Sequence, residues 1–539
     1  MIDKYLQKLV LDATEKLGLS LPLDTIVIET SKDSAHGDYA TNIAMQLARA
    51  MRKNPREVAS LLINELDKSD MEKVEIAGPG FINFFLKPSA LTKYVPLINE
   101  LGRDFGNGAK IHKTVNIEFV SANPTGKLHL GHARGAAVGD ALARLFTKSG
   151  YDVIREFYVN DAGVQISNLG KSLYVRYLNV LGVERKMPED GYFSDDLIMI
   201  AKQLINEVGN KYIEESDEGL EFFKTRGSEI FLEIIKEDLH QFRVDFDVYS
   251  FETKVKENGA IDKLLTKLEP YSYVEEGATF LKTSAFSDDK DRVIVKSNGE
   301  HTYFLPDIVY HLDKLSRGAD LLIDILGADH HGYIGRMKSA LQMFNYSADA
   351  LEVQIIQMVR IIKDGQELKM SKRTGNAITL EELATEVGVD AARYFFLAKS
   401  ASTHFDFDLD LAQEQSSANP VYYAQYAHAR LSTVLSKGEK YPLDISGSLL
   451  TEESELSLIK QLIAYPSVVS DATMTREPYK VANFIQKLAS LIHSYYTEVR
   501  ILNETNVALT SARLGLSKAA QIVLKDALSL LGVNAPISM

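Results

Sequence analysis

Two histidines, His129 and His132, stand three residues apart where the sequence pattern changes from a strand to a helix. An apolar, β-branched run at 115–120 precedes them, and the helix pattern of 131–148 begins with small residues. The N-terminus of a helix offers unpaired N–H groups and a positive dipole end, which both favour phosphate oxygens. We therefore predict a nucleotide phosphate site here. The residues assigned to it are Lys127, His129, Gly131 and His132.

A metal pair is one alternative for the two histidines. Zinc requires further ligands of suitable type, and the chain has no Cys and no Asp/Glu-His cluster close to His129. We therefore expect no zinc and no other protein-bound metal ion. Two ordinary surface histidines remain the second alternative.

A second cationic segment follows an expected strand at 354–362 and a turn at Asp364-Gly365. Thr379 and Glu382 then mark the start of a helix in capping-box spacing. Several cations in one loop suit a polyphosphate whose charge grows as a bond breaks, although such a cluster alone is usually a solvated face. Together the two segments indicate ATP chemistry. The residues assigned to the triphosphate in this second segment are Lys369, Met370, Lys372 and Arg373.

The two motifs resemble the two signatures of class I aminoacyl-tRNA synthetases, and their surroundings resemble arginyl-tRNA synthetases in particular. The resemblance implies attachment of L-arginine to tRNA(Arg) through an arginyl-adenylate, with ATP and Mg²⁺ as the nucleotide substrate and AMP and pyrophosphate as products. It extends over most of the chain. The segments that carry it are Glu118-Phe-Val-Ser-Ala-Asn123, Asn160-Asp-Ala-Gly-Val-Gln165, Gly327-Ala-Asp-His-His-Gly-Tyr333, Gln357-Met-Val-Arg360, Lys369-Met-Ser-Lys-Arg-Thr-Gly-Asn376 and Tyr423-Ala-Gln-Tyr-Ala-His-Ala-Arg430.

Arginine would be selected through its guanidinium, a planar cation that carboxylates and an aromatic face satisfy best. Tyr303 and Asp307, four residues apart, match the tyrosine and aspartate that hold the arginine side chain in the family, and Glu252 is a looser match to a second acidic partner. A core tyrosine and a capping aspartate on one helix are the plain structural alternative. The resemblance also assigns Ser121, Asn123 and Glu118 to the α-amino end of arginine and His330 to the ribose or adenine.

Two regions match family contacts with tRNA. The segment Gly78-Pro-Gly-Phe-Ile-Asn-Phe84 resembles the one that reads a D-loop base, with Phe81 for stacking and Asn83 for hydrogen bonding, and it also fits a plain amphipathic strand. Near the C-terminus, aromatic rings and a cation share a helix face, as stacking with unpaired anticodon bases requires, and core packing is the alternative. The residues assigned to the anticodon are Tyr423, Tyr426 and Arg430, with Tyr496, Arg500 and Met539 as weaker matches.

Composition and length set further limits. A chain of 539 residues exceeds one hydrophobic core, and its hydrophobic fraction of 45% is that of a soluble globular protein. No apolar run is long enough to span a membrane and the N-terminus does not resemble a signal peptide, so we expect a cytoplasmic protein. The net charge of -14 requires local basic and aromatic patches for RNA binding. The resemblance implies a monomer.

The order of expected elements predicts three domains. Residues 1–110 mix helices and strands, end in a Gly/Asn-rich stretch at 102–108 that we interpret as a linker, and resemble the additional N-terminal domain of the family. Residues 111–400 alternate strands and helices, which predicts an α/β, Rossmann-like catalytic domain with a mostly parallel sheet and an acidic insertion at about 185–280. Residues 401–539 are continuously helical and predict an all-α anticodon-binding bundle.

Three other functions compete with this interpretation. A class I synthetase for cysteine would use zinc with Cys ligands, which the chain lacks, and Tyr303 with Asp307 suits a cationic amino acid better than glutamine. A catalytically silent tRNA-binding relative would not need His129 or Lys369. A nucleotidylyltransferase would share only the H-x-G-H turn and would have no use for a C-terminal helical bundle.

Overall fold

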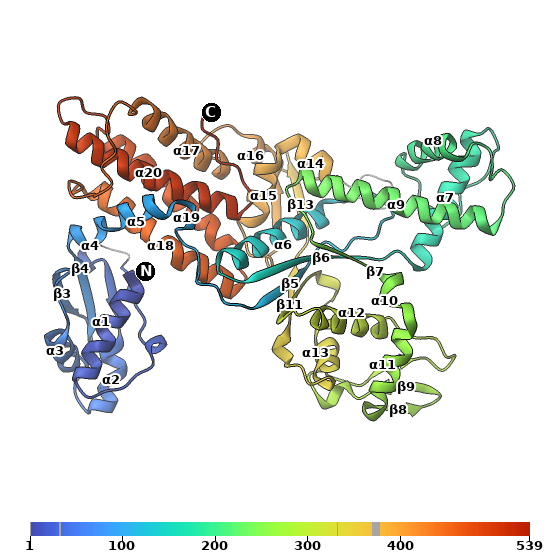
Figure 1. The fold of residues 1–539 in the computed structure, drawn as a ribbon, viewed down its shortest axis with the longest axis horizontal. Helices are drawn as coiled ribbons and strands as arrows, with labels where there is room; N and C mark the ends of the chain where they lie inside the picture. The colour runs from blue at the N-terminus through green and yellow to red at the C-terminus, as the bar shows by residue number, and fades with distance from the viewer. Residues whose placement is uncertain (1, 32–33, 331, 369–377) are drawn as a thin grey trace.

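The computed structural model describes residues 2–31, 34–330, 332–368 and 378–539. The molecule is elongated (Figure 1), with a small N-terminal unit and a helical bundle at one end, a sheet in the middle and long helices at the other end. None of the helices in these described ranges is long and apolar enough to cross a membrane.

The central sheet has five strands in the order β12-β11-β5-β6-β7, and every pair in it is parallel. The Rossmann-like sheet predicted from the alternating pattern is confirmed. One strand of this sheet, β7, lies within the range of about 185–280 that was expected to be an insertion. Part of that range therefore belongs to the central sheet. The strands are β5 (Thr114–Glu118), β6 (Asp152–Val159), β7 (Val248–Phe251), β11 (Leu321–Gly327) and β12 (Leu351–Ile356).

The helix that follows β5 is α6 (Leu130–Lys148), and it is buried along most of its length. Its small residues serve packing as well as ligand approach, because a Cβ on Gly139 would lie 2.2 Å from the ring of Phe119. Near its start, the buried guanidinium of Arg134 donates to the carbonyl oxygens of Gln357 (2.8 Å), Ser400 (2.9 Å) and Thr403 (3.0 Å). α6 thereby holds two later loops against the sheet.

The single strand expected at 354–362 is two strands in two sheets. β12 ends at Ile356, and β13 (Val359–Lys363) pairs with β15 (Phe405–Asp408) instead of with β11. The break falls at Gln357-Met358, where Arg134 binds the backbone. The turn expected at Asp364-Gly365 is confirmed, since both residues have positive φ (51° and 71°) and join β13 to β14 (Gln366–Glu367).

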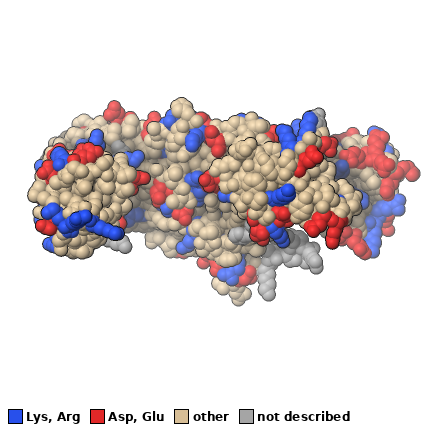
Figure 2. All heavy atoms as spheres, turned by 90° about the horizontal axis from the view of Figure 1, so that it is seen from below, with Lys and Arg blue, Asp and Glu red and all other residues tan. Residues whose placement is uncertain are grey.

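Two groups of helices extend from the sheet. α7 (Gly163–Val180), α8 (Asp196–Val208) and α9 (Asp217–Gln241) share a hydrophobic cluster at one end of the molecule. Figure 2 shows acidic side chains gathered at this end. A second cluster forms beneath β11. It draws on α11 (Ala260–Leu268), β9 (Ala278–Leu281), β10 (Arg292–Val295), α12 (Phe304–Ser316) and α13 (Tyr333–Met343). Two further elements adjoin these, α10 (Glu252–Val255) beside α12 and β8 (Ser272–Glu275) beside β9.

The N-terminal unit has a four-stranded sheet in the order β1-β2-β4-β3 packed against helices. The mixture of helices and strands expected here is confirmed, although the apolar run at 25–29 is not a strand along its length. Pro22 precedes a 3-10 turn, Leu23–Thr25, and the short strand starts only at Glu29. The elements are α1 (Ile2–Lys16), β1 (Glu29–Thr30), β2 (Tyr39–Thr41), α2 (Ile43–Met51), α3 (Pro55–Glu65), β3 (Met71–Ala77) and β4 (Phe81–Leu86).

The C-terminal part is a bundle of long helices, as predicted. They pack against the central sheet through α6 and against the N-terminal unit through two short helices. The bundle comprises α17 (Pro420–Lys437), α18 (Glu453–Thr475), α19 (Tyr479–Glu498) and α20 (Val507–Leu530), and its neighbours are α4 (Pro88–Thr92), α5 (Tyr94–Leu101), α14 (Leu380–Val387), α15 (Val389–Leu397) and α16 (Leu409–Gln413).

The stretch 102–108, interpreted as a linker, is packed against the bundle. Phe105 is 1% exposed and stacks on Tyr465 of α18, with 6.4 Å between ring centroids. Asn99 of α5 donates to the carbonyl oxygen of Gly515 in α20 (3.1 Å). The N-terminal unit therefore rests on the helical bundle and not on the central sheet, as Figure 1 also shows.

Candidate active site and RNA-contacting surfaces

A cavity of about 1230 Å³ opens at the carboxyl ends of the parallel strands. Glu118 ends β5, Tyr158 lies next to the end of β6, and Gly327 ends β11, and all three line it. Ligands of open α/β sheets collect at this edge. The predicted site residues that line the cavity are Glu118, Ser121, His129, Gly131, His132, Asp307 and His330.

The two imidazoles stack at the N-terminus of α6, with ring centroids 3.8 Å apart. His129 is the N-cap, and its Nδ1 accepts from the backbone N–H of Gly131 (3.1 Å). Nδ1 of His132 accepts in turn from the backbone N–H of His129 (3.3 Å). Because each Nδ1 is an acceptor, each neutral ring carries its proton on Nε2. The backbone thus prepares both rings as Nε2–H donors beside a helix N-terminus, where a phosphate would bind.

The residues on both sides of the second cationic segment lie at this cavity. Leu368 lines it, and Thr379 pairs with His129 across a β-bridge. The N–H of Leu380 donates to the carbonyl oxygen of Leu128 (2.9 Å), and the expected capping box of Thr379 and Glu382 is confirmed. The four residues assigned to the triphosphate, Lys369, Met370, Lys372 and Arg373, lie outside the described residues.

Lys127 does not line the cavity. Its ammonium donates to Glu381 of α14 (2.9 Å) and lies 3.6 Å from Asp196 of α8. The hydrogen bond to Glu381 raises the pKa of Lys127. Its charge is therefore neutralised at the junction of α8, α14 and the His129 turn, and the structure does not bring it to the predicted phosphate site.

The backbone after β5 is strained where it meets the cavity. Val120 and Ser121 have positive φ values of 68° and 41°. Residues other than glycine rarely adopt this left-handed conformation, above all a β-branched residue such as Val120, and those that do are often found at functional sites. The Ser121 hydroxyl donates to Glu118 (2.9 Å) and accepts from the backbone N–H of Tyr158 (3.1 Å). Both residues are thus fixed at the cavity wall. Asn123 instead donates to Gln165 of α7 (2.6 Å) and does not line the cavity.

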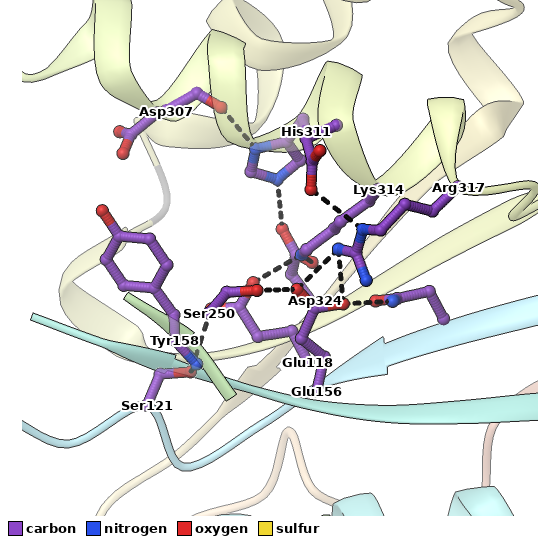
Figure 3. A network of polar contacts seen from close by, with 12 residues as sticks. Glu118, Ser121, Glu156, Tyr158, Ser250, Asp307, His311, Lys314, Arg317 and Asp324 are labelled. Carbon is purple, nitrogen blue, oxygen red and sulfur yellow. Dashed lines mark hydrogen bonds and ion pairs between the residues drawn. The ribbon is translucent and has the colours of Figure 1, made fainter. Parts of the chain in front are cut away.

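A buried ion network supports the wall from behind (Figure 3). Lys314, fully buried on α12, contacts Glu118 and Asp324, with 3.0 Å to the latter. The imidazole of His311 donates from Nδ1 to the carbonyl oxygen of Asp307 and from Nε2 to Asp324, at 2.7 Å each. Burial alone would lower the pKa of His311, but the Asp324 carboxylate outweighs it and raises that pKa. Both ring nitrogens face acceptors, so the surroundings of His311 favour its protonated form.

Asp307 faces the cavity from the first turn of α12. Figure 3 shows its carboxylate turned away from the network and on the same side as the Tyr158 hydroxyl. Burial raises the pKa of Asp307 to about 7, and the nearby carboxylates of Glu118 and Glu252 add to the increase while His311 opposes it. Among the described residues, no Lys or Arg side chain forms an ion pair with Asp307, so a bound cation would favour its ionised form.

Glu252 is buried at the start of α10 and pairs with Lys256. The side-chain amide of Asn160 is oriented so that its nitrogen donates to the carbonyl oxygen of Ala162 (3.0 Å) and to the second carboxylate oxygen of Glu252 (2.7 Å). Glu252 does not line the cavity, but its charge reaches Asp307 and Tyr158, whose pKa values it helps to raise. Its placement therefore fits an outer acidic partner.

Tyr303 is not brought into the cavity. It precedes α12 as the N-cap and is 84% exposed. Three other tyrosines line the cavity near Asp307, namely Tyr158, Tyr310 and Tyr333. The rings of Tyr158 and Tyr310 lie 4.6 Å apart, which provides the aromatic surface that a guanidinium favours.

Comparison with known proteins agrees with this geometry. Family models described as the arginyl tRNA synthetase N-terminal domain, the class I (R) tRNA synthetase catalytic domain and the DALR anticodon-binding domain match residues 4–86, 97–434 and 424–539. The chain belongs to the arginyl-tRNA synthetase family. An arginine--tRNA ligase of Geobacillus kaustophilus is 49% identical, over 100% of this chain and 99% of the relative. One of Bacillus subtilis is 50% identical over 96% of this chain and 95% of the relative.

The fold is also that of solved members of the family. The arginyl-tRNA synthetase structure of Thermus thermophilus superposes with a TM-score of 0.78 at 21% sequence identity, covering 100% of both chains. In the described part of this arginyl-tRNA synthetase family member, no group of three or more His, Cys, Asp or Glu side chains could hold a metal ion.

In the N-terminal unit, β4 presents the two residues predicted to read a D-loop base. Phe81 and Asn83 alternate on it with Ile82, which is fully buried. Their cross-strand neighbours on β3 and β2 include two alanines, Ala77 opposite Phe81 and Ala40 opposite Asn83. Asn83 is only 4% exposed, so the structure leaves little of its side chain accessible to a base. Figure 2 shows both basic and acidic side chains over this unit.

In the bundle, four of the predicted anticodon residues form one surface on α17 and α19. The guanidinium of Arg430 lies 4.7 Å from the ring centroid of Tyr426 and 4.4 Å from that of Tyr496. Tyr423 joins them through His493, whose ring is 4.5 Å away. Arg500 follows the end of α19 and donates to the carbonyl oxygen of Leu502 (3.3 Å), and Met539 is 52% exposed.

The sequence did not identify several residues of the site. Lys314, His311 and Asp324 hold Glu118 and Asp307, and Arg134 holds the loop at Gln357. Their residue types in helix or strand patterns are ordinary, and only their burial marks them.

Proposed function

We propose that this protein attaches L-arginine to tRNA(Arg) in an ATP-dependent reaction through an arginyl-adenylate, releasing AMP and pyrophosphate. The observation that carries the proposal is the joining of two unlike sites in one cavity. One part of the cavity wall carries two imidazole donors at a helix N-terminus, and another part carries the Asp307 carboxylate with the rings of Tyr158, Tyr310 and Tyr333.

At the nucleotide end, the arginine carboxylate attacks the α-phosphorus of ATP and pyrophosphate leaves. Negative charge then develops on phosphoryl oxygens, and Nε2–H of His129 and of His132 would stabilise it without any covalent enzyme intermediate. Gly131 gives the phosphate access to the backbone and His330 is assigned to ribose or adenine. We assign the departing pyrophosphate to Lys369, Lys372 and Arg373, with Met370 bracing their loop. Mg²⁺ would arrive on the phosphate oxygens as part of the ATP substrate.

At the amino-acid end, the guanidinium of arginine would pair with Asp307 and stack on the neighbouring tyrosines. A planar cation with five donors satisfies a buried carboxylate better than the point charge of lysine does. The outer acidic charge of Glu252 favours the same cation. Glu118 and Ser121 would set the wall near the α-amino group. We retain Asn123 and Tyr303 as candidates that would have to reorient to touch the substrate.

The rest of the chain is assigned to tRNA. We propose that residues 1–110 contact the D-loop through Phe81 and Asn83, that 111–400 form the catalytic domain, and that 401–539 bind the anticodon. The reaction would take place in the cytoplasm, and the protein would act as a monomer. The anticodon contacts in this proposal are Tyr423, Tyr426, Arg430, Tyr496, Arg500 and Met539.

The test incubates the protein with ATP, bulk tRNA and each labelled amino acid in turn. Arginine alone should become stably attached to tRNA, and labelling by lysine or glutamine would refute the amino-acid site. Asp307→Asn should raise the KM for arginine on the order of a hundredfold while the KM for ATP changes little, because it leaves a buried cation without its partner. Asp313→Asn, on the solvent side of the same helix, is the matched control.

A further inference from the structure

His493 of α19 lies at the centre of the aromatic surface formed by α17 and α19. Its Nδ1 is 3.1 Å from Nη1 of Arg430, and its Nε2 is 3.3 Å from the carbonyl oxygen of Tyr423. A guanidinium only donates and a carbonyl only accepts, so Nδ1 accepts and Nε2–H donates. These contacts require the neutral ring. Burial lowers the pKa of His493, as does the Arg430 cation, so the ring stays neutral at physiological pH.

Arg430 lies against two tyrosine rings at this surface. Its guanidinium is within cation–π distance of Tyr426 and Tyr496, and its Nη2 donates to the Tyr426 hydroxyl (3.2 Å). All these contacts, in the part of the chain that the structure describes, are to rings, a hydroxyl and an imidazole, and none is to a carboxylate. The two rings are 38% and 41% exposed. Arg430 thus keeps its positive charge and several N–H donors for a ligand at the surface.

We propose that His493 is the positioning residue of the anticodon surface. By accepting from Nη1, it fixes the long Arg430 side chain between the two tyrosine rings before RNA arrives. An unpaired base that stacks on an exposed ring then meets guanidinium donors already in place, so less side-chain entropy is lost on binding. This inference rests on the proposed function, because it concerns how the same protein recognises tRNA.

Two substitutions separate positioning from simple packing. His493→Leu removes both hydrogen bonds and should raise the KM for tRNA about tenfold, with the KM for ATP, the KM for arginine and the Tm nearly unchanged. His493→Gln restores an acceptor for Arg430 and a donor for the Tyr423 carbonyl, and should return the KM for tRNA to within about threefold of the wild type. His240→Leu, an exposed histidine of α9, is the control and should change none of these values.

A double-mutant cycle with Arg430→Ala decides the matter even if His493→Leu lowers the Tm. If His493 acts through Arg430, its loss should cost almost nothing further once Arg430 is absent. Additive losses, or an unchanged KM for tRNA in His493→Leu, would overturn the inference. A wild-type protein that fails to charge tRNA with arginine would instead refute the proposed function, so the two failures are distinguishable.

Discussion

At the scale of single residues, the pKa of Asp307 makes arginine use depend on pH. Its pKa of about 7 lies above the ordinary 3.8, so the folded protein holds a proton that an arginine cation must displace. The KM for arginine should therefore fall as pH rises from 6 to 8, by up to about tenfold, while the KM for ATP does not follow the same curve. Aminoacylation kinetics at fixed saturating ATP measure this dependence.

The same shift affects stability with a defined sign. Because the folded state binds this proton more tightly than the unfolded state, Asp307 makes the free energy of unfolding decline as pH rises between 3.8 and about 7. Asp307→Asn should flatten that decline and remove the pH step in the KM for arginine. A step that persists in the variant would show that another group titrates.

At the scale of elements, Arg134 joins α6 to the two loops that complete the cavity wall. Its guanidinium satisfies three backbone carbonyls that belong to segments over 220 residues later in the chain. Arg134→Met should lower the free energy of unfolding by about 2–4 kcal/mol and raise the KM for ATP, because buried carbonyls lose charged donors and Gln357-Met358 loses its anchor. Urea unfolding and ATP kinetics measure the two effects.

Arg360 is the matched control on the neighbouring strand β13. Its guanidinium pairs with Asp406 at 2.8 and 2.9 Å, but both side chains are about half exposed. Exposed ion pairs contribute little to stability, so Arg360→Met should change unfolding only slightly. Equal losses in the two variants would mean that burial of Arg134 is not what matters.

Helices, strands and turns could be predicted from the sequence where they depend on residues that are close together in the chain. The strand and helix around His129, the Asp364-Gly365 turn and the capping box of Thr379 depend on neighbouring residues and are confirmed. The break of one expected strand at Gln357 was not predictable, because the side chain that binds the backbone there is Arg134, 223 residues earlier. From the sequence, Lys314 would be expected on the exposed face of a helix. It is buried instead, and its partner Glu118 lies 196 residues away in the chain.

At the scale of the whole molecule, Arg393 of α15 ties the end of the bundle to the catalytic domain. This fully buried guanidinium contacts Asp140 of α6 and donates to the carbonyl oxygens of Leu531 (2.9 Å) and Phe242 (3.0 Å). Gly532 caps α20 with φ of +66°, and a Cβ there would lie 2.3 Å from Arg393. Gly532→Ala should therefore destabilise the protein by about 2–4 kcal/mol.

Gly18→Ala controls for backbone strain alone, since Gly18 has φ of +78° and nothing within 4 Å of its Cβ position. It should cost about 1–2 kcal/mol. Thermal and urea unfolding compare the two variants. If Gly532→Ala cost no more than Gly18→Ala, the close approach of Arg393 would contribute nothing.

The seating of the N-terminal unit on the helical bundle has a geometric consequence. Phe105 against Tyr465 and Asn99 against Gly515 fix the span between the strand that carries Phe81 and the helix that carries Arg430. If these two surfaces bind the same RNA, the fixed distance between them restricts the shape of that RNA. The protein would then select substrates by the distance and angle between the two arms of an L-shaped RNA as well as by their bases. An RNA with the correct bases but a changed angle between its arms would be a poor substrate.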